Sequence, residues 1–89
     1  MDRIHIFYSG TVQGVGFRYT VHSIATGLAV MGWVRNLPDG RVEMLAEGPR
    51  EKLEKLCSSI EGHFEGYIRH KDEQWYGAQG QINGFEIRR

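Results

Sequence analysis

The sequence predicts an α+β sandwich in which two helices cover one face of a mostly antiparallel sheet of four or five strands. Two periodicities and one turn signal support this. Polar and apolar residues alternate in several short runs, as in half-buried strands, whereas two longer runs repeat apolar residues every three or four positions, as in amphipathic helices. Between two of the strand-like runs lies Asp39-Gly40, the strongest hairpin signal in the chain. We expect residues 1–89 to form a single domain.

The first half of the chain is predicted to form a strand, a helix and a hairpin. Residues 3–8 alternate as a strand does, and residues 17–28 have helical spacing. Residues 31–37 and 41–47 follow as two strands joined by the Asp-Gly turn. The residues expected to face the core from these segments are Ile4, Ile6, Tyr8, Val21, Ile24, Ala25, Leu28, Val42, Met44 and Ala46.

The second half is predicted to form a helix and then one or two strands. Pro49 suits the first turn of a helix, and Gly62 is expected to end it. Charged residues interrupt the alternation of residues 68–76, while residues 84–89 are typical of a short final strand. The element order βαββαβ, with or without a fifth strand, is that of a ferredoxin-like sandwich. The apolar stripe of the second helix is Leu53, Leu56, Cys57, Ile60 and Phe64.

The segment GTVQGVGFR, residues 10–18, has the features of an anion site. Gly14 and Gly16 allow backbone conformations that turn several N–H groups inward, and the helix that follows offers more N–H groups and a favourable dipole. Arg18 can bind a phosphate through two parallel hydrogen bonds. A right-handed crossover would bring Asn36 to the same edge of the sheet. The alternative is a tight strand–helix connection with an exposed arginine.

The same segment excludes several kinds of chemistry. It lacks the Gly-Lys-Ser/Thr ending of a nucleotide P-loop and the GxGxxG spacing of a dinucleotide site. Val12 stands where a cysteine phosphatase would carry its nucleophile. No pair of carboxylates and no cluster of metal ligands lies next to it in the sequence. The segment therefore predicts a phosphate-binding site that uses no metal, cofactor or covalent nucleophile.

GTVQGVGFR and GWVRNLPDGRVE, residues 32–43, resemble the two signature segments of the acylphosphatase family. The first matches the family's G-x-V-Q-G-V-x-F-R pattern at every specified place. The resemblance implies a hydrolase that splits small acyl phosphates into a carboxylate and inorganic phosphate without metal or cofactor. It implies that Arg18 and loop N–H groups hold the phosphoryl group, and that Asn36 orients the attacking water. The implied phosphate-binding residues are Gln13, Gly14, Val15, Gly16, Phe17 and Arg18.

The sequence departs from the family pattern at two places. Ala29 stands where the family usually has glycine, and a left-handed alanine costs about 1–2 kcal/mol. We therefore expect the first helix to end differently, with Gly27 taking over that role. Lys71 and Glu73 stand where the family more often has apolar strand residues, which leaves the register of residues 68–76 open.

Composition bears on partners and location. Eleven Lys and Arg balance eleven Asp and Glu, and the zero net charge argues against a general nucleic-acid binder. The single cysteine, Cys57, favours a reducing compartment, and no run approaches the roughly 18 apolar residues of a membrane span. We expect a cytoplasmic monomer whose partners are an acyl phosphate and its product phosphate, with no nucleic acid or membrane.

Two other functions stay open. The domain could bind phosphate or carbamoyl phosphate without catalysis, as part of a larger assembly. A ferredoxin-like RNA-binding domain would instead need exposed aromatic residues on central strands and a basic surface, a signature that His5 and Phe7 do not make. The physiological substrate also stays open, since acetyl phosphate, carbamoyl phosphate and 1,3-bisphosphoglycerate all carry the required bond.

Overall fold

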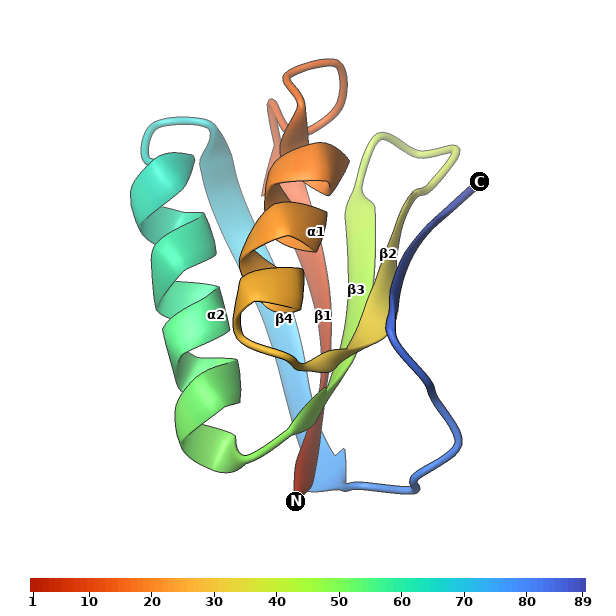
Figure 1. Ribbon diagram of the computed structural model, residues 1–89. Coiled ribbons are helices and arrows are strands. Elements are labelled where there is room, and N and C mark those ends of the chain that lie inside the picture. The colour runs from red at the N-terminus through yellow and green to blue at the C-terminus, as the bar shows by residue number, and fades with distance from the viewer.

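Five strands and two helices make up the computed structural model, which describes residues 1–89. Both helices cover the same face of the sheet, and the other face has no helix (Figure 1). The predicted α+β sandwich with a five-stranded sheet is confirmed. Neither helix has the length and apolar character needed to cross a membrane. In chain order the elements are β1 (Asp2–Gly10), α1 (Phe17–Gly27), β2 (Met31–Asn36), β3 (Val42–Gly48), α2 (Arg50–His63), β4 (Ile68–Gly77) and β5 (Phe85–Arg88).

The strand order β4-β1-β3-β2-β5 decides which loops meet. β3 lies between β1 and β2 and is antiparallel to both, so β1 and β2 run in the same direction. Val42 of β3 pairs with Tyr8 on one side and with Asn36 on the other. The loop that follows β1 therefore starts at the same end of the sheet as Asn36, where β1 and β2 both finish. The last strand, β5, pairs in parallel with β2.

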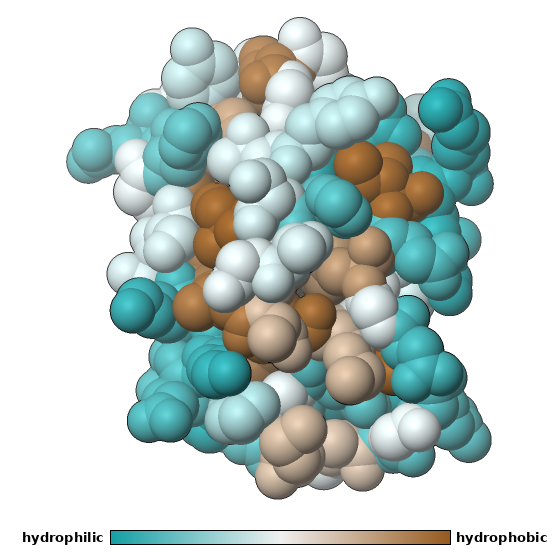
Figure 2. Space-filling model, in the orientation of Figure 1, coloured by the Kyte–Doolittle hydropathy of each residue, from teal (hydrophilic) through white to brown (hydrophobic).

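The core lies between the sheet and the two helices. The side chains predicted to face it are buried, apart from Ile24 and Leu28 of the first helical segment, which pack against its margin. On the helix-covered surface, polar residues dominate both flanks and hydrophobic residues occur in small groups (Figure 2). The residues of the core are Ile4, Ile6, Tyr8, Val12, Phe17, Val21, Ala25, Val30, Val34, Val42, Met44, Ala46, Leu53, Leu56, Cys57, Ile60 and Phe64.

The helix-free face of the sheet carries charged side chains in pairs. Glu43 is buried; its carboxylate accepts a hydrogen bond from Arg35 Nε at 2.7 Å and lies 2.6 Å from His5 Nε2. Arg35 and Arg88 each place a guanidinium about 5 Å from the centre of the Trp33 ring, at 5.1 and 4.9 Å. The largest aromatic ring on this face is thus already in contact with the protein's own cations.

A second buried carboxylate on this face, that of Glu47, holds the connection between β4 and β5. It accepts hydrogen bonds from the backbone N–H groups of Gln79 at 2.8 Å and Gly80 at 3.0 Å, and from Arg3 Nε at 2.6 Å. These hydrogen bonds hold the pKa of Glu47 below its ordinary value of 4.5, and the bond from the Gln79 N–H has the largest effect. Burial of the carboxylate acts in the opposite direction.

Both predicted helix ends differ from the structure. Ala29 itself takes the left-handed conformation, with φ 57°, and Gly27 stays helical. The reason is a pair of closing hydrogen bonds, in which the Ala29 N–H donates to Thr26 O at 3.1 Å and the Val30 N–H to Ala25 O at 3.2 Å. These bonds and the burial of Val30 outweigh the strain of a left-handed alanine.

In the second helix, Gly62 lies inside α2 rather than at its end. The helix continues to His63, because Phe64 still reaches the core and its N–H donates to Ile60 O at 3.0 Å. Gly66, with φ 86°, is the residue that turns the chain toward β4. Gly66, which has a positive φ and follows the apolar stripe, marks where the chain changes direction, and Gly62, which lies within the stripe, does not.

Residues 68–77 form an edge strand despite their charges, with one shift of register against β1 between Ser9 and Gly10. Lys71 and Glu73 pair with Tyr8 and Ile6 of β1, so they lie on the helix-covered face of the sheet. Lys71 Nζ lies 2.6 Å from Glu61 Oε2 of α2 and 3.1 Å from Glu73 Oε1. The charged residues therefore close the margin of the core against α2, and the alternation of the strand is kept.

Candidate active site

The loop between β1 and α1 takes its shape from two glycines. Gly14 and Gly16 have φ of 78° and 76°, in the left-handed region that residues with a Cβ avoid. A Cβ at either position would meet no atom within 4 Å, so the backbone conformation rather than the available space requires glycine. Gly16 is also the N-cap of α1, and its carbonyl accepts the Thr20 N–H at 3.1 Å.

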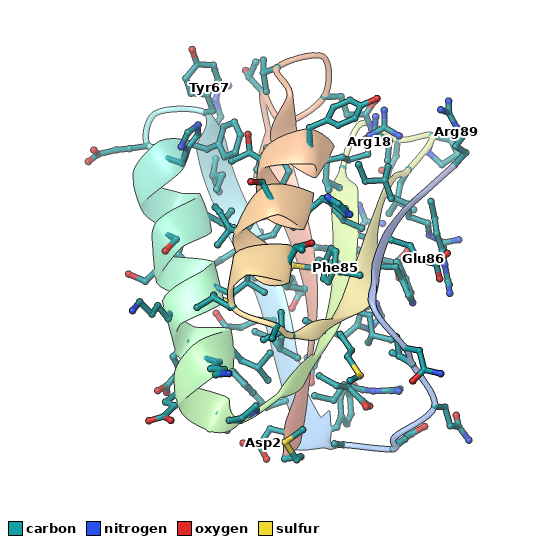
Figure 3. The ribbon with its side chains drawn as sticks, in the orientation of Figure 1. Asp2, Arg18, Tyr67, Phe85, Glu86 and Arg89 are labelled. Carbon is teal, nitrogen blue, oxygen red and sulfur yellow. The ribbon has the colours of Figure 1, made fainter.

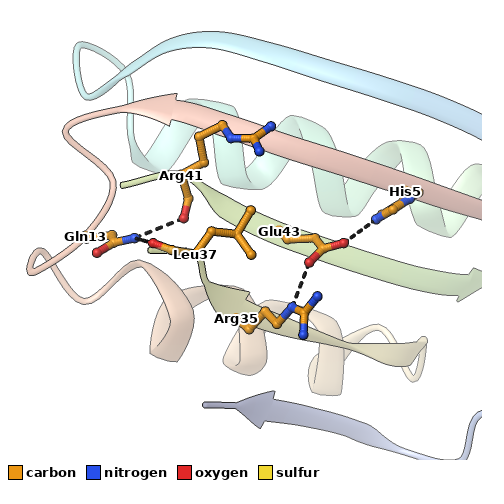
Figure 4. A network of polar contacts seen from close by, with 6 residues as sticks. All are labelled: His5, Gln13, Arg35, Leu37, Arg41 and Glu43. Atoms are coloured by element: carbon orange, nitrogen blue, oxygen red, sulfur yellow. Dashed lines mark hydrogen bonds and ion pairs between the residues drawn. The ribbon is translucent and has the colours of Figure 1, made fainter. Parts of the chain in front are cut away.

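Three contacts fix this loop to the rest of the protein. The Val12 side chain is fully buried, and the Thr11 N–H donates to Tyr67 O at 2.9 Å. On the other side, Gln13 Nε2 donates to Leu37 O at 2.8 Å and to Arg41 O at 3.0 Å (Figure 4). The loop is thus tied both to the α2–β4 connection and to the β2–β3 hairpin.

The loop and the end of β2 enclose a cavity of about 160 Å³. Arg18 and Asn36, which lie 18 positions apart in the sequence numbering, both line it. Arg18 lies at the end of the molecule opposite Asp2, on the same end as Tyr67 (Figure 3). Of the residues expected to bind phosphate, Gln13 and Val15 do not line the cavity. The complete lining is Val12, Gly14, Gly16, Phe17, Arg18, Tyr19 and Asn36.

The electrostatics of the cavity favour an anion. The N-terminus of α1 has no side-chain cap and no acidic residue in its first turn, so its N–H groups and dipole are not neutralised by the chain. Arg18 forms no salt bridge with any carboxylate of the protein. Phe17 supports this arrangement, because its buried ring packs on Tyr8 and Phe64 and fixes the start of the helix.

Asn36 contributes a buried acceptor without a partner. Its Oδ1 atom is buried and makes no hydrogen bond within the protein. An unpaired buried acceptor costs roughly 1–3 kcal/mol, so it is expected where a ligand or water completes the site. The neighbouring Arg35 points to the other face of the sheet and binds Glu43, as the alternation of the strand predicts.

The lining has no carboxylate, histidine, cysteine, serine, threonine or lysine side chain, and the phenol of Tyr19 is its only hydroxyl group. Burial raises the pKa of the Cys57 thiol to about 12, so this thiol stays protonated at neutral pH. No group of three or more His, Cys, Asp or Glu side chains is arranged to hold a metal ion. The cavity offers a guanidinium, backbone N–H groups and a carboxamide, which together can hold a tetrahedral anion and a water molecule.

Two features of the site were not expected from the sequence. Tyr19 lines the cavity although its ring is 68 % exposed, and the only available signal was its position next to Arg18. The Gln13 side chain serves to hold the loop. Its two partners are the main-chain carbonyls of Leu37 and Arg41. Every residue has a main-chain carbonyl, so the sequence does not indicate which two carbonyls Gln13 will bind.

The chain is similar to known proteins over its whole length. The acylphosphatase family model matches residues 4–87. An acylphosphatase of Acaryochloris marina is 60 % identical over 81 residues, which cover 91 % of this chain and 87 % of that protein. The crystal structure of acylphosphatase from Bacillus subtilis is 34 % identical and superposes with a TM-score of 0.92 over 100 % of both chains. The structure of T. kodakarensis HypF, at 29 % identity and a TM-score of 0.81, matches all of this chain over 12 % of its own length. The chain belongs to the acylphosphatase family of hydrolases.

Proposed function

We propose that this protein hydrolyses the carboxyl–phosphate bond of small acyl phosphates by direct attack of water. Arg18 and the N–H groups of the loop and the first turn of α1 hold the phosphoryl group, and Asn36 holds the water. The observation that carries the proposal is that one cavity is lined by Arg18, the two loop glycines and Asn36, whose Oδ1 has no partner within the protein. Gln13 contributes through its side chain, which holds the loop in place.

The proposed reaction needs no further group. The water oxygen attacks phosphorus in line with the bond to the carboxyl oxygen, that bond breaks, and the electron pair leaves with the carboxylate. The proton of the water passes to a phosphate oxygen. Asn36 accepts one hydrogen bond from the water and so fixes the direction of attack. It does not act as a base, because a carboxamide is too weakly basic to remove the proton. Such positioning, together with charge stabilisation, supplies most of the catalysis in phosphoryl transfer.

The leaving group explains the expected substrate class. A carboxylate has a conjugate acid with a pKa of about 4–5, so it leaves without help from a general acid. A phosphate monoester releases a far more basic oxygen, and the cavity lining holds no carboxylic acid or histidine to protonate it. We expect para-nitrophenyl phosphate to react much more slowly than an acyl phosphate.

The second candidate is a module that binds phosphate or carbamoyl phosphate without hydrolysing it. The likeness to a segment of T. kodakarensis HypF favours it, because there a domain of this fold makes up 12 % of a larger chain. Asn36 separates the two candidates: a pure binding module has no use for a group that orients water.

The test follows benzoyl phosphate hydrolysis by ultraviolet absorbance, with and without EDTA, for wild type, Arg18→Ala and Asn36→Ala. We expect EDTA-insensitive turnover in wild type. Asn36→Ala should lower kcat by about 10²-fold or more with little change in phosphate affinity, whereas Arg18→Ala should weaken both. Asn83→Ala and Arg69→Ala, at exposed positions outside the cavity, serve as matched controls. Phosphate binding by a folded wild type without turnover would favour the binding module.

The organisation of the protein is part of the same proposal. We infer a single-domain monomer that works in the cytoplasm without metal or cofactor. Sedimentation of the purified chain should give the mass of one 10.2 kDa protomer. A dimer at micromolar concentration would contradict the expected monomer.

A further inference from the structure

We propose that Tyr19 recognises the acyl part of the substrate, so that the enzyme favours aromatic acyl groups over the acetyl group. The inference rests on the proposed hydrolysis of acyl phosphates and adds a specificity residue to it. Tyr19 lines the same cavity as Arg18 and Asn36. At 68 % exposure it is also the most exposed Phe, Trp or Tyr side chain of the protein.

The fold itself gives the Tyr19 ring no structural role. Tyr19 follows Arg18 in the first turn of α1, but the residues that α1 buries are Phe17, Val21 and Ala25. The ring takes no part in the aromatic pairs of the protein, and no arginine lies over it. A solvated first turn usually favours small polar or acidic residues. A large aromatic side chain here is therefore free to contact a ligand.

The direction of in-line attack indicates where the acyl group must lie. Asn36 and Arg18 line the same cavity, and the leaving carboxylate lies on the side of phosphorus opposite to the water that Asn36 holds. The acyl group therefore extends away from Asn36. Tyr19 belongs both to the lining and to the exposed surface, and so it stands where the cavity opens.

The chemistry of the contact predicts a preference. A benzoyl ring can stack on the phenol face or meet its edge, whereas an acetyl group offers one methyl. Aromatic pairs of this kind contribute about two- to tenfold in binding beyond the burial of area. Since the intrinsic reactivity of each acyl phosphate is the same for every variant, the ratio of benzoyl to acetyl turnover isolates the effect of the side chain.

The experiment compares kcat/KM for benzoyl phosphate and acetyl phosphate in wild type, Tyr19→Ala, Tyr19→Phe and Tyr76→Ala. Tyr76 is a matched control because it is 50 % exposed and pairs with Arg3, on a strand remote from the cavity. We expect the benzoyl-to-acetyl ratio to fall about two- to tenfold in Tyr19→Ala, through KM rather than kcat. Tyr19→Phe and Tyr76→Ala should keep the wild-type ratio.

Binding of the non-hydrolysable benzoylphosphonate and acetylphosphonate, measured by calorimetry, gives the same ratio without turnover. An unchanged ratio in Tyr19→Ala, or an equal fall in Tyr76→Ala, would overturn the role of Tyr19. Tight phosphonate binding by a wild type that hydrolyses neither substrate would overturn the proposed function, and the phosphonate ratio would still decide the role of Tyr19.

Discussion

Gln13 shows how one side chain can set the geometry of a site that it does not line. Its amide group bridges the carbonyls of Leu37 and Arg41, and so joins the loop to the hairpin that follows Asn36. We predict that Gln13→Ala lowers kcat/KM for benzoyl phosphate by about tenfold, because the loop and Asn36 lose their common support. Two carbonyls also lose their donor, which should cost about 1–2 kcal/mol of unfolding free energy.

Enzyme assays and thermal unfolding of Gln13→Ala check both values. The control is Gln81→Ala, since Gln81 is exposed and makes no hydrogen bond through its side chain. Wild-type kcat/KM in Gln13→Ala, with the stability loss present, would assign Gln13 to stability alone.

The site residues differ in how far the sequence could predict them. Arg18 and Asn36 lie in long motifs, and the shared direction of β1, which leads into the loop, and β2, which ends at Asn36, gives an independent reason to expect them together. Tyr19 carries no comparable signal, because an exposed tyrosine on a helix has no fixed meaning until the cavity beside it is known. The sequence thus indicated that Arg18 and Asn36 lie near each other, but it gave no sign that Tyr19 lines the same cavity.

At the scale of single elements, the end of α1 stores strain that a substitution can release. Ala29 holds φ at 57° in order to close the helix with two hydrogen bonds. We predict that Ala29→Gly raises the free energy of unfolding by about 1 kcal/mol, because glycine adopts this conformation without a Cβ clash. The melting temperature should rise by about 4–8 °C in calorimetry.

Gly27→Ala is the matched comparison for this prediction. Gly27 is helical and a Cβ there meets nothing within 4 Å, so alanine should stabilise the helix by about 0.5–1 kcal/mol. Both variants should therefore melt higher than wild type, one by gaining a glycine and the other by losing one. A lower melting temperature for Ala29→Gly would mean that the left-handed alanine carries no strain.

The connection from β4 to β5 depends on one carboxylate, which makes its stability depend on pH. The pKa of Glu47 is lowered in the folded protein, mainly by the Gln79 N–H, so its contribution to stability is fully present above the ordinary pKa of 4.5. The contribution is lost as the pH falls below that value and through the lower folded pKa. We predict that Glu47→Gln costs about 1–3 kcal/mol at pH 7, and progressively less as the pH falls toward 3.

Urea unfolding of wild type and Glu47→Gln at several pH values between 7 and 3 measures this difference. The reference variant is Glu54→Gln, whose carboxylate lies on an exposed part of α2. A constant difference between wild type and Glu47→Gln across the range would show that the charge of Glu47 does not hold the loop.

The elements also show where periodicity fails as a guide. β1, β3 and α2 each turn one continuous apolar face to the core, so their patterns predicted them well. β4 lies at the edge of the sheet, where Lys71 and Glu73 find partners on α2 and on each other. Those partners come from distant parts of the chain, and local alternation contains no information about them.

At the scale of the whole molecule, the phosphate site and global stability should be coupled. A ligand that binds only the folded state adds RT ln(1 + [L]/Kd), which is about 2.7 kcal/mol at a hundredfold excess over Kd. We predict that inorganic phosphate raises the melting temperature of wild type and has little effect on Arg18→Ala. Chloride at the same ionic strength is the control, and an equal shift in Arg18→Ala would place the bound phosphate elsewhere.

The position of β3 between β1 and β2 has a consequence for the newly made chain. Residues 10–36 contain every residue that lines the candidate cavity. However, β1, which leads into the loop, and β2, which ends at Asn36, are not neighbours in the sheet. They are held at the correct separation by Val42 and its neighbours, which contribute nothing to the chemistry. A nascent polypeptide that ends just after Asn36 therefore cannot yet form the proposed phosphate site, because the site needs β3, which is translated later.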